Sequence, residues 1–378
     1  MKTSGVKEIG GVCVGKKQLY NPNRFNGLTA AISYVVALAA FAALPYVMVL
    51  CCRNFLLKLY KFDTFAYMLV NVGISQALIL LIVLAVSLVK RTNPLNGGGY
   101  VAKWDGVQAL MGAVGIVGIM TVFYSIHSDF ASDSNYLFGI TGSDIEENYS
   151  PFSGLFAIAY LFVMSVFPAI IEEMAFRGII MRGLEQFGNV FAVIVSSVAF
   201  SLMHGNFSQM ILQFIGGLAI GSVVMITKNW LIGSFMHFFN NAFSITYTLV
   251  LENFDGGISS LRLSAAAHAA TTLIGLACLI IAIVYFAGVY THNVKRETSG
   301  TVKEEKYAIK RYYAVKQGED ERLVESNVIP ETRRKNEYDD RRFLIWGKYR
   351  KLNKKSNPVA TYILLGAGLV LAIVGLFL

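Results

Sequence analysis

The sequence predicts an all-α, polytopic integral membrane protein, and three observations lead to that fold class. Of the 378 residues, 55% are hydrophobic and only 15% are charged, whereas about 25% are charged in an ordinary soluble domain. The mean hydropathy is +0.53. Nine apolar stretches approach or exceed the roughly 20 residues that a helix needs to cross a bilayer. They lie near 28–51, 66–89, 106–126, 152–171, 188–204, 207–227, 230–250, 265–290 and 359–378.

These stretches divide the chain into regions. About eight core transmembrane helices are expected, with one more helix at the C-terminus. The expected regions are an N-terminal arm (1–27), N-terminal transmembrane helices (28–126), a central core (150–250), an eighth transmembrane helix (265–290), a charged insert (292–357) and a C-terminal transmembrane helix (359–378). The first stretch begins too late and is too long for a cleaved signal peptide, so we expect it to remain in the mature protein.

The basic residues of the loops predict the orientation, because Lys and Arg resist translocation. The N-terminal arm carries five of them, and the insert 292–357 holds 18 of the 33 in the chain against 11 acidic residues. Loop 127–150 has no Lys or Arg but five acidic residues. The arm and the insert are therefore predicted to be cytoplasmic, and loop 127–150 external, in a multi-pass protein of a prokaryotic plasma membrane.

One loop conflicts with this orientation. Arg53, Lys58 and Lys61 fall within 52–65, which the scheme places outside. Either the first two spans pack as a re-entrant pair, or the rule is broken there.

The net charge of +9 lies mainly in the insert 292–357 and does not indicate a nucleic-acid partner. The insert could bind an acidic protein, but beside a membrane we favour anionic lipid headgroups, which attract each nearby basic residue by about 1 kcal/mol. The four cysteines have neither a C-x-x-C pair nor zinc-finger spacing, so free thiols are expected.

Charged side chains at the end of the fourth span are functional candidates, because a charge within a span costs at least about 2.5 kcal/mol. Glu173 and Arg177 are four residues apart and can pair on one helix face, a pairing interpreted as structural. Glu172 points away from that face and needs another partner or water. Pro168 leaves one helical carbonyl unpaired, as expected beside a polar cavity.

Two further spans contribute polar groups. His204 ends the fifth span, and His237 in the seventh is followed one turn later by Asn241. Any single histidine within a span has about even odds of being a structural hydrogen-bonding group. His268, in the eighth span, lacks polar company and is interpreted as structural.

Together these groups could perform amide hydrolysis. A desolvated glutamate can accept and return a proton, while histidine and amide groups hold an oxyanion or a metal. The catalytic motifs of other protease classes are missing, since the sequence has no His-Glu-x-x-His, no Gly-x-Ser-x-Gly and no pair of intramembrane aspartates.

The motifs resemble those of the CAAX protease and bacteriocin-processing (CPBP, or Abi) family of intramembrane endopeptidases. The family patterns are Glu-Glu-x-x-x-Arg, Phe-x-x-x-His and His-x-x-x-Asn/Asp/Ser, and all three occur here in order over roughly 150–250. The matching residues are Glu172, Glu173, Arg177, Phe200, His204, His237 and Asn241. Three motifs in order at the ends of successive apolar segments are a fairly specific signal.

The resemblance implies a role for each residue. Glu172 would activate water with help from His204, while His237 and Asn241 would stabilise the oxyanion. Glu173, Arg177 and Phe200 would support the site. If a metal is bound, Glu172, His204 and His237 would be the ligands of a Zn²⁺ or other divalent ion, but a metal-free mechanism is equally open. The substrate would be a CAAX-type tail, a leader peptide or a membrane protein.

The depth of these residues is a test of the interpretation. In upright helices Glu172 and His204 would lie about 20 to 30 Å apart. The stretch 154–187 must therefore tilt, break at Pro168 or keep Glu172 at mid-depth. We expect Glu172, His204, His237 and Asn241 to meet in a water-filled cavity open to the cytoplasm.

Two other functions are alternatives to an endopeptidase. The protein could be an ion-coupled transporter or a catalytically silent membrane scaffold of the same family.

Overall fold

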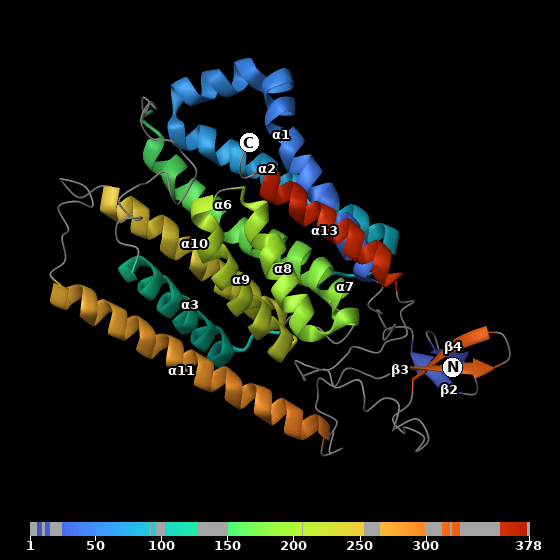
Figure 1. Ribbon diagram of the computed structural model, residues 1–378. Coiled ribbons are helices and arrows are strands. Elements are labelled where there is room, and N and C mark those ends of the chain that lie inside the picture. Colours follow the sequence, from blue (N-terminus) through green and yellow to red (C-terminus); the bar gives the residue numbers. More distant parts are fainter. Residues whose placement is uncertain are drawn as a thin grey trace.

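The protein is a bundle of long helices, seen in a computed structural model (Figure 1). The structure describes residues 6–9, 12–15, 25–90, 92–95, 103–126, 150–205, 207–252, 265–298, 312–317, 320–325 and 356–375. Within these ranges the membrane-spanning part is entirely helical, which confirms the predicted all-α, polytopic class.

Each of the nine apolar stretches forms a helix. The helices are α1 (Gly27–Phe62), α2 (Thr64–Lys90), α3 (Gly106–Ile126), α6 (Ser153–Glu173), α8 (Asn189–Met203), α9 (Phe207–Thr227), α10 (Trp230–Glu252), α11 (Ala265–Thr298) and α13 (Pro358–Gly375). Between α6 and α8 the chain continues as a π-helix (Met174–Met181), the short α7 (Arg182–Leu184) and a 3-10 turn (Glu185–Phe187).

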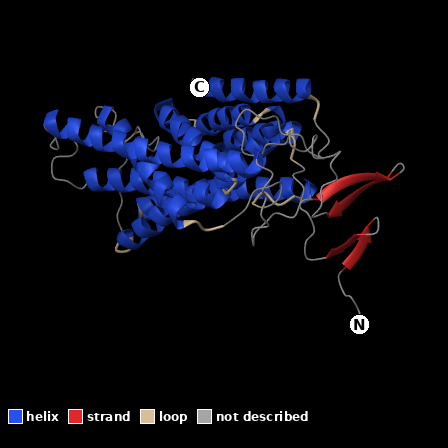
Figure 2. Ribbon diagram, turned by 90° about the horizontal axis from the view of Figure 1, so that it is seen from below, coloured by secondary structure: helices blue, strands red, loops and turns tan. Residues whose placement is uncertain are grey.

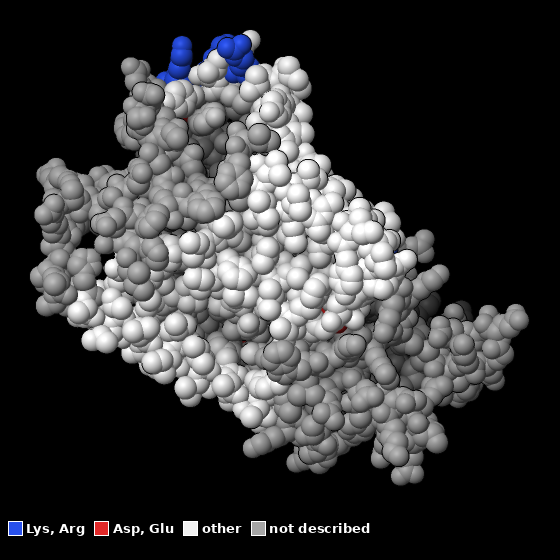
Figure 3. Space-filling model, viewed as in Figure 1, with Lys and Arg blue, Asp and Glu red and all other residues white. Residues whose placement is uncertain are grey.

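Seven segments of the described chain are long and apolar enough to cross a membrane. Their outer faces expose large apolar side chains, among them Leu88 (76%) and Ile158 (69%). In water such surfaces would drive aggregation, but in a bilayer they are the lipid-facing side. Among the described residues on the face seen in Figure 3, almost no side chains are charged except at its upper end.

The 52–65 loop expected between the first two spans is largely helix. α1 extends to Phe62, and only Asp63 separates it from α2. At 36 residues α1 would be about 54 Å long if straight, but it turns along its length (Figure 1), and it contains Pro45, the usual cause of a sharp bend. Arg53, Lys58 and Lys61 are exposed on its C-terminal part.

Asp63 fastens this corner to the start of α6. It caps α2 by accepting the backbone N–H of Ala66 at 3.0 Å, and its second oxygen accepts both the backbone N–H (3.0 Å) and the hydroxyl (2.8 Å) of Ser150. The hydroxyl of Ser153 donates to the same oxygen. The carboxylate thereby joins three helices at one end of the bundle.

Helices α8 and α9 form a hairpin that enters and leaves by the opposite end of the bundle. Glu185, just before α8, pairs with Lys228, just after α9, at 3.4 Å. α8 has only 15 residues, about 22 Å at 1.5 Å per residue, so it is too short to cross a bilayer. The C-terminal end of α8 therefore lies inside the bundle.

The same end of the bundle holds the starts of α1 and α13. The hydroxyl of Ser356 accepts the backbone N–H of Leu28 at 3.2 Å and the side-chain amide of Gln186 at 2.9 Å. The N-terminal arm, the hairpin ends and the final part of the insert therefore meet there.

Two short β-hairpins lie outside the bundle, where the sequence indicated only an arm and a charged insert. β1 (Val6–Ile9) pairs antiparallel with β2 (Val12–Gly15), and β3 (Tyr312–Gln317) pairs with β4 (Asp320–Glu325). The two hairpins belong to separate sheets but lie beside each other, as both views show (Figure 2). Segments about 300 residues apart in sequence thus meet at one end of the molecule.

The main hydrophobic core lies between α3, the π-helix, α8, α9 and α10. Met120, Met181, Val224 and Ile232 are fully buried in it. α10 packs on α6 and α3, and α2 packs on the other side of α6. This arrangement places α6 and the π-helix at the centre, in contact with nearly every element that carries a motif residue.

Candidate active site

The first motif lies where the α-helix changes to a π-helix. Glu172 and Glu173 end α6, and Arg177 belongs to the π-helix that follows. π-helical turns are rare and are frequently found at functional sites. Pro168 does not break the helix, so of the three arrangements expected for 154–187 the structure keeps Glu172 near the middle of a continuous helical segment, Ser153–Phe187.

Glu173 and Arg177 form the buried ion pair that their spacing predicts. Arg177 Nη1 lies 2.6 Å from Glu173 Oε1, and the two side chains are 1% and 0% exposed. Arg177 Nη2 also donates to the backbone carbonyl of Gly217 on α9 at 3.0 Å. A buried charge is tolerated when it is paired and hydrogen-bonded, and here the pair fixes the π-helix against α9.

His237 reaches this pair from α10 and stands between the two glutamates. Its Nδ1 lies 3.0 Å from Glu173 Oε1, while its Nε2 lies 3.8 Å from Glu172 Oε2. An ionised carboxylate only accepts hydrogen bonds, so Nδ1 carries the proton that is donated to Glu173. In the neutral ring Nε2 is therefore an acceptor facing Glu172.

His204 caps the end of α8 inside the bundle. Its Nδ1 donates to the backbone carbonyl of Phe200 at 2.9 Å, which again leaves Nε2 as the acceptor of a neutral ring. Glu172 and His237 both lie close enough to interact with this ring electrostatically. Because α8 stops short, His204 comes to the same depth as the first motif.

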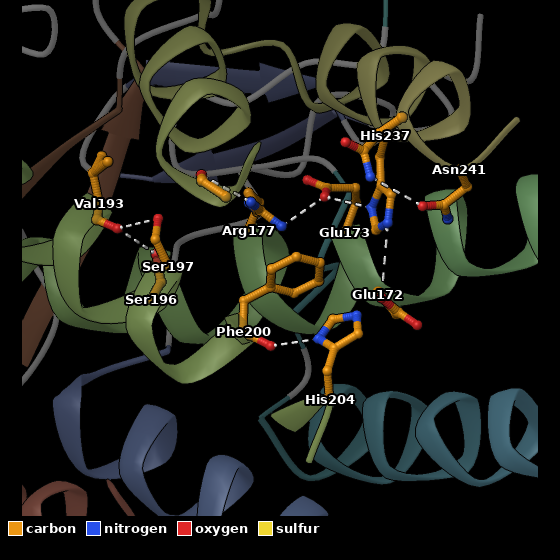
Figure 4. A network of polar contacts seen from close by, with 12 residues as sticks. Glu172, Glu173, Arg177, Val193, Ser196, Ser197, Phe200, His204, His237 and Asn241 are labelled. Atoms are coloured by element: carbon orange, nitrogen blue, oxygen red, sulfur yellow. Dashed lines mark hydrogen bonds and ion pairs between the residues drawn. The ribbon is translucent and has the colours of Figure 1, made fainter. Parts of the chain in front are cut away.

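Phe200 is the apolar centre around which these groups are arranged (Figure 4). Its ring centroid is 4.9 Å from that of His204 and 5.5 Å from that of His237, with both pairs edge to face. The guanidinium of Arg177 lies over the same ring, 4.9 Å from its centroid. Cation–π and aromatic contacts of this kind hold rings in defined orientations, so Phe200 positions both histidines.

Asn241 lies one turn after His237 and contacts the backbone of α6. Its Nδ2 donates to the carbonyl of Met164 at 3.3 Å. This is the carbonyl that Pro168, four residues later, cannot bond. The neighbouring Asn240 donates in turn to Asn241 Oδ1 at 3.3 Å. One of the two amide protons of Asn241 is thus used to support the helix.

Gln76, which the sequence analysis did not identify, also belongs to the site. It lies on α2, and its Nε2 donates to Glu172 Oε1 at 2.8 Å. The signal that could have found it is an amide inside an otherwise apolar span, but α2 also contains Asn71 and Ser75. Only the packing of α2 on α6 shows that Gln76, and not Asn71 or Ser75, contacts Glu172.

The packing of α10 on α9 requires glycine beside Glu173. A Cβ atom at Gly233 of α10 would overlap a methyl of Val224 on α9, and it would lie in ordinary contact, at 3.4 Å, with Glu173 Oε2. A larger residue there would push α10 away from α9 and shift His237 with it.

The metal ligands expected from the sequence, Glu172, His204 and His237, remain a prediction. Among the residues that the structure describes, no three His, Cys, Asp or Glu side chains are arranged to hold one ion. A zinc site requires several such donors to converge on one point.

The structure brings Glu172, His204, His237 and Asn241 together from three parts of the chain. Glu173 and Arg177 form the predicted supporting pair, and Phe200 contacts both histidines. The side chain of His268 lies outside the described residues. The catalytic roles and the water-filled cavity remain predictions.

Comparison with known proteins gives one match. Residues 154–243 match the family model described as Type II CAAX prenyl endopeptidase Rce1-like. The matched segment contains all seven motif residues of the site. Neither the curated proteins nor the solved structures gave a significant match.

Proposed function

We propose that the protein is an intramembrane endopeptidase, because residues 154–243 match the family model described as Type II CAAX prenyl endopeptidase Rce1-like. It hydrolyses a peptide bond of a membrane-associated substrate with a water molecule that Glu172 activates. The observation that carries this proposal is the difference between two adjacent glutamates. Glu173 is completely buried and bonded to Arg177 and His237, whereas Glu172 is 13% exposed.

The first step is the activation of water. Glu172 Oε2 takes one proton from a water molecule, and the oxygen of that water attacks the scissile carbonyl carbon. The bare Nε2 of His204 assists by accepting a hydrogen bond from the Glu172 carboxyl once that group has taken the proton. A carboxylate and an imidazole acting together on water are the ordinary components of general-base catalysis.

The second step is the stabilisation of the tetrahedral oxyanion. His237 donates to it from Nε2 only in the imidazolium form, because the proton of the neutral ring is on Nδ1 and is bonded to Glu173. Asn241 donates a hydrogen bond to the oxyanion through its second amide proton, because the first is bonded to the carbonyl of Met164. Donors fixed in advance toward a developing negative charge are among the most effective catalytic devices.

The third step is the release of the amine. The C–N bond breaks, and the proton that Glu172 took from water passes to the leaving nitrogen. Glu172 is thereby restored to its carboxylate form. The products are a new carboxyl terminus and a new amino terminus, and no oxidant, reductant or cofactor is consumed.

The substrate depends on the host: it is a leader peptide or a membrane protein in a prokaryotic plasma membrane, where we place the protein, and a prenylated CAAX-type tail, as the family description names it, in a eukaryotic cell. We place the N-terminus in the cytoplasm, since most of the basic residues are in the arm and the insert. The same charges favour anionic headgroups as the partner of 292–357.

The test compares wild type with Glu172→Gln, both purified in detergent. Each is incubated with prenylated and unprenylated CAAX peptides and with a library of membrane peptides. New termini are read by mass spectrometry, and bound metal is measured on the same samples. Wild type should cleave, and Glu172→Gln should be at least 100-fold slower.

Two further variants sort the histidines. His204→Gln should lose most of the activity, and His268→Gln should keep it. Equal cleavage by wild type and Glu172→Gln would refute the proposal, and cleavage by neither would favour a carrier or a scaffold. Metal bound in proportion to activity, and lost in Glu172→Gln, would replace the metal-free scheme with a metal-assisted one.

A further inference from the structure

Gln76 is a buried amide from outside the segment that matches the family. It lies on α2, almost 100 residues before Glu172, and is 6% exposed. Burial of a primary amide in an apolar helix is costly unless its donors and its acceptor are bonded. Its bonding therefore shows what the protein uses it for.

Its nitrogen holds the proposed base. Gln76 Nε2 donates to Glu172 Oε1 at 2.8 Å, and Glu172 Oε2 is left facing His237 Nε2 at 3.8 Å. The nitrogen must be the atom that faces Glu172, because an ionised carboxylate only accepts hydrogen bonds. The bond fixes the rotation of the carboxylate and selects which of its oxygens is free to act.

Its oxygen is left without a partner. Gln76 Oε1 is buried and has no hydrogen-bond partner among the described residues. A buried acceptor of this kind usually marks a group that a water or a ligand satisfies. It is part of the same amide that holds Glu172, so the missing donor must lie beside the proposed base.

We propose that Gln76 positions the attacking water, with Nε2 holding Glu172 and Oε1 accepting a hydrogen bond from that water. This inference rests on the endopeptidase function proposed above. A water has two protons. If one is directed to Glu172 Oε2 and the other to Gln76 Oε1, a lone pair of the oxygen is left to point at the scissile carbonyl carbon. Such orientation is a large part of what an enzyme adds to a reaction with water.

The main test is Gln76→Met, which keeps the length and the apolar burial but removes both polar groups. We expect kcat to fall about 10- to 100-fold with KM within about twofold of wild type, because the water and not the substrate loses its contact. The melting temperature in detergent should stay close to that of wild type, so that the loss in kcat is separated from a loss of stability. Ser75→Ala, one residue away with a hydroxyl bonded only within α2, is the matched control.

Gln76→Glu tests the donor and the acceptor of the Gln76 side chain, because it keeps the volume of that side chain nearly unchanged. Its carboxyl would lie beside that of Glu172, and two neighbouring carboxylates share one proton at moderate pH. The protonated form retains a donor and an acceptor. Gln76→Glu should therefore regain activity relative to Gln76→Met as the pH is lowered.

Four outcomes are distinguishable. A loss in kcat with an unchanged KM and an unchanged melting temperature supports the role in positioning water. Wild-type kcat in Gln76→Met overturns it, and so does a lowered melting temperature with no recovery of activity in Gln76→Glu, which would show a structural role only. Full activity in Glu172→Gln would instead refute the endopeptidase mechanism itself, in an experiment independent of Gln76.

Discussion

Asn241 donates its side-chain amide to the backbone carbonyl of Met164, 3.3 Å away on a different helix. Pro168 makes this bond necessary, because it lies four residues after Met164 and has no N–H to offer. Pro168, four residues before the first motif, and the asparagine of the third motif therefore form one structural unit. This unit places α10 at a fixed height against α6, and so places His237 beside Glu172.

The first prediction concerns this unit. Asn241→Ala leaves the carbonyl of Met164 unpaired and should lower the stability by about 1 to 3 kcal/mol. Pro168→Ala restores a helical N–H, so the double variant should recover most of the loss. Thermal unfolding in detergent measures all four members of the cycle. Additive losses would show that Asn241 and Pro168 act independently, while activity should stay low in both variants that lack Asn241.

The second prediction separates the adjacent glutamates by stability. Glu173→Gln leaves Arg177, 1% exposed, without its charge partner, and breaking a buried pair in this way costs about 3 to 5 kcal/mol. Glu172→Gln keeps an oxygen that accepts from Gln76 Nε2 and loses the charge that faces His237 at 3.8 Å. The melting temperature should therefore fall strongly for Glu173→Gln and little for Glu172→Gln. The reverse order would contradict the assignment of structural and catalytic roles.

The third prediction concerns the glycine that follows Arg177. A Cβ atom at Gly178 would lie 2.8 Å from the backbone oxygen of Pro94, which cannot swing away as a side chain can. Gly178→Ala should therefore lower the stability by about 1 to 3 kcal/mol and reduce activity by displacing the π-helix. Gly154→Ala, where nothing lies within 4 Å, is the control and should be neutral or slightly stabilising.

The fourth prediction uses the pH dependence of Asp63. Burial alone would raise the pKa of this carboxyl, but hydrogen bonds from Ser153, Ser150 and Ala66 outweigh it and lower the pKa to about 2. The stabilisation is thus fully present above the ordinary pKa of about 4 and is lost as the pH falls toward 2.

Asp63→Asn checks this in the same detergent. It should have a lower melting temperature than wild type at pH 7, by the amount typical of a lost helix cap, about 0.5 to 2 kcal/mol. The gap should narrow between pH 4 and pH 2.5. A gap that is constant with pH would mean that the asparagine substitution disturbs packing and not the hydrogen bonds of the charged carboxylate.

The helices and the motif residues could be predicted from the sequence because both depend on local patterns. A run of apolar residues determines a span wherever it occurs, and the spacing of four that joins Glu173 to Arg177 produced the ion pair seen in the structure. The segment 154–243, matched by the family model, lies within the core expected near 150–250.

The remaining features depend on contacts between distant segments. The sequence gives no measure of how deep α8 ends, so the difficulty of bringing His204 to Glu172 could be stated but not resolved. Gln76 is one of several polar residues in α2, and only the packing of α2 against α6 distinguishes it. The 52–65 segment was expected as a loop, because its three cations mark a membrane boundary without showing that the helix continues through it.

The α8–α9 hairpin also determines which compartment each end of the chain faces. Because it returns to the end where it begins, as the Glu185–Lys228 pair shows, it adds no net crossing. The start of α1 and the start of α13 are then separated by an even number of crossings, in agreement with the contact of Leu28 with Ser356. A reporter fused before residue 25 and one inserted in the 326–350 region should therefore be found on the same side of the membrane.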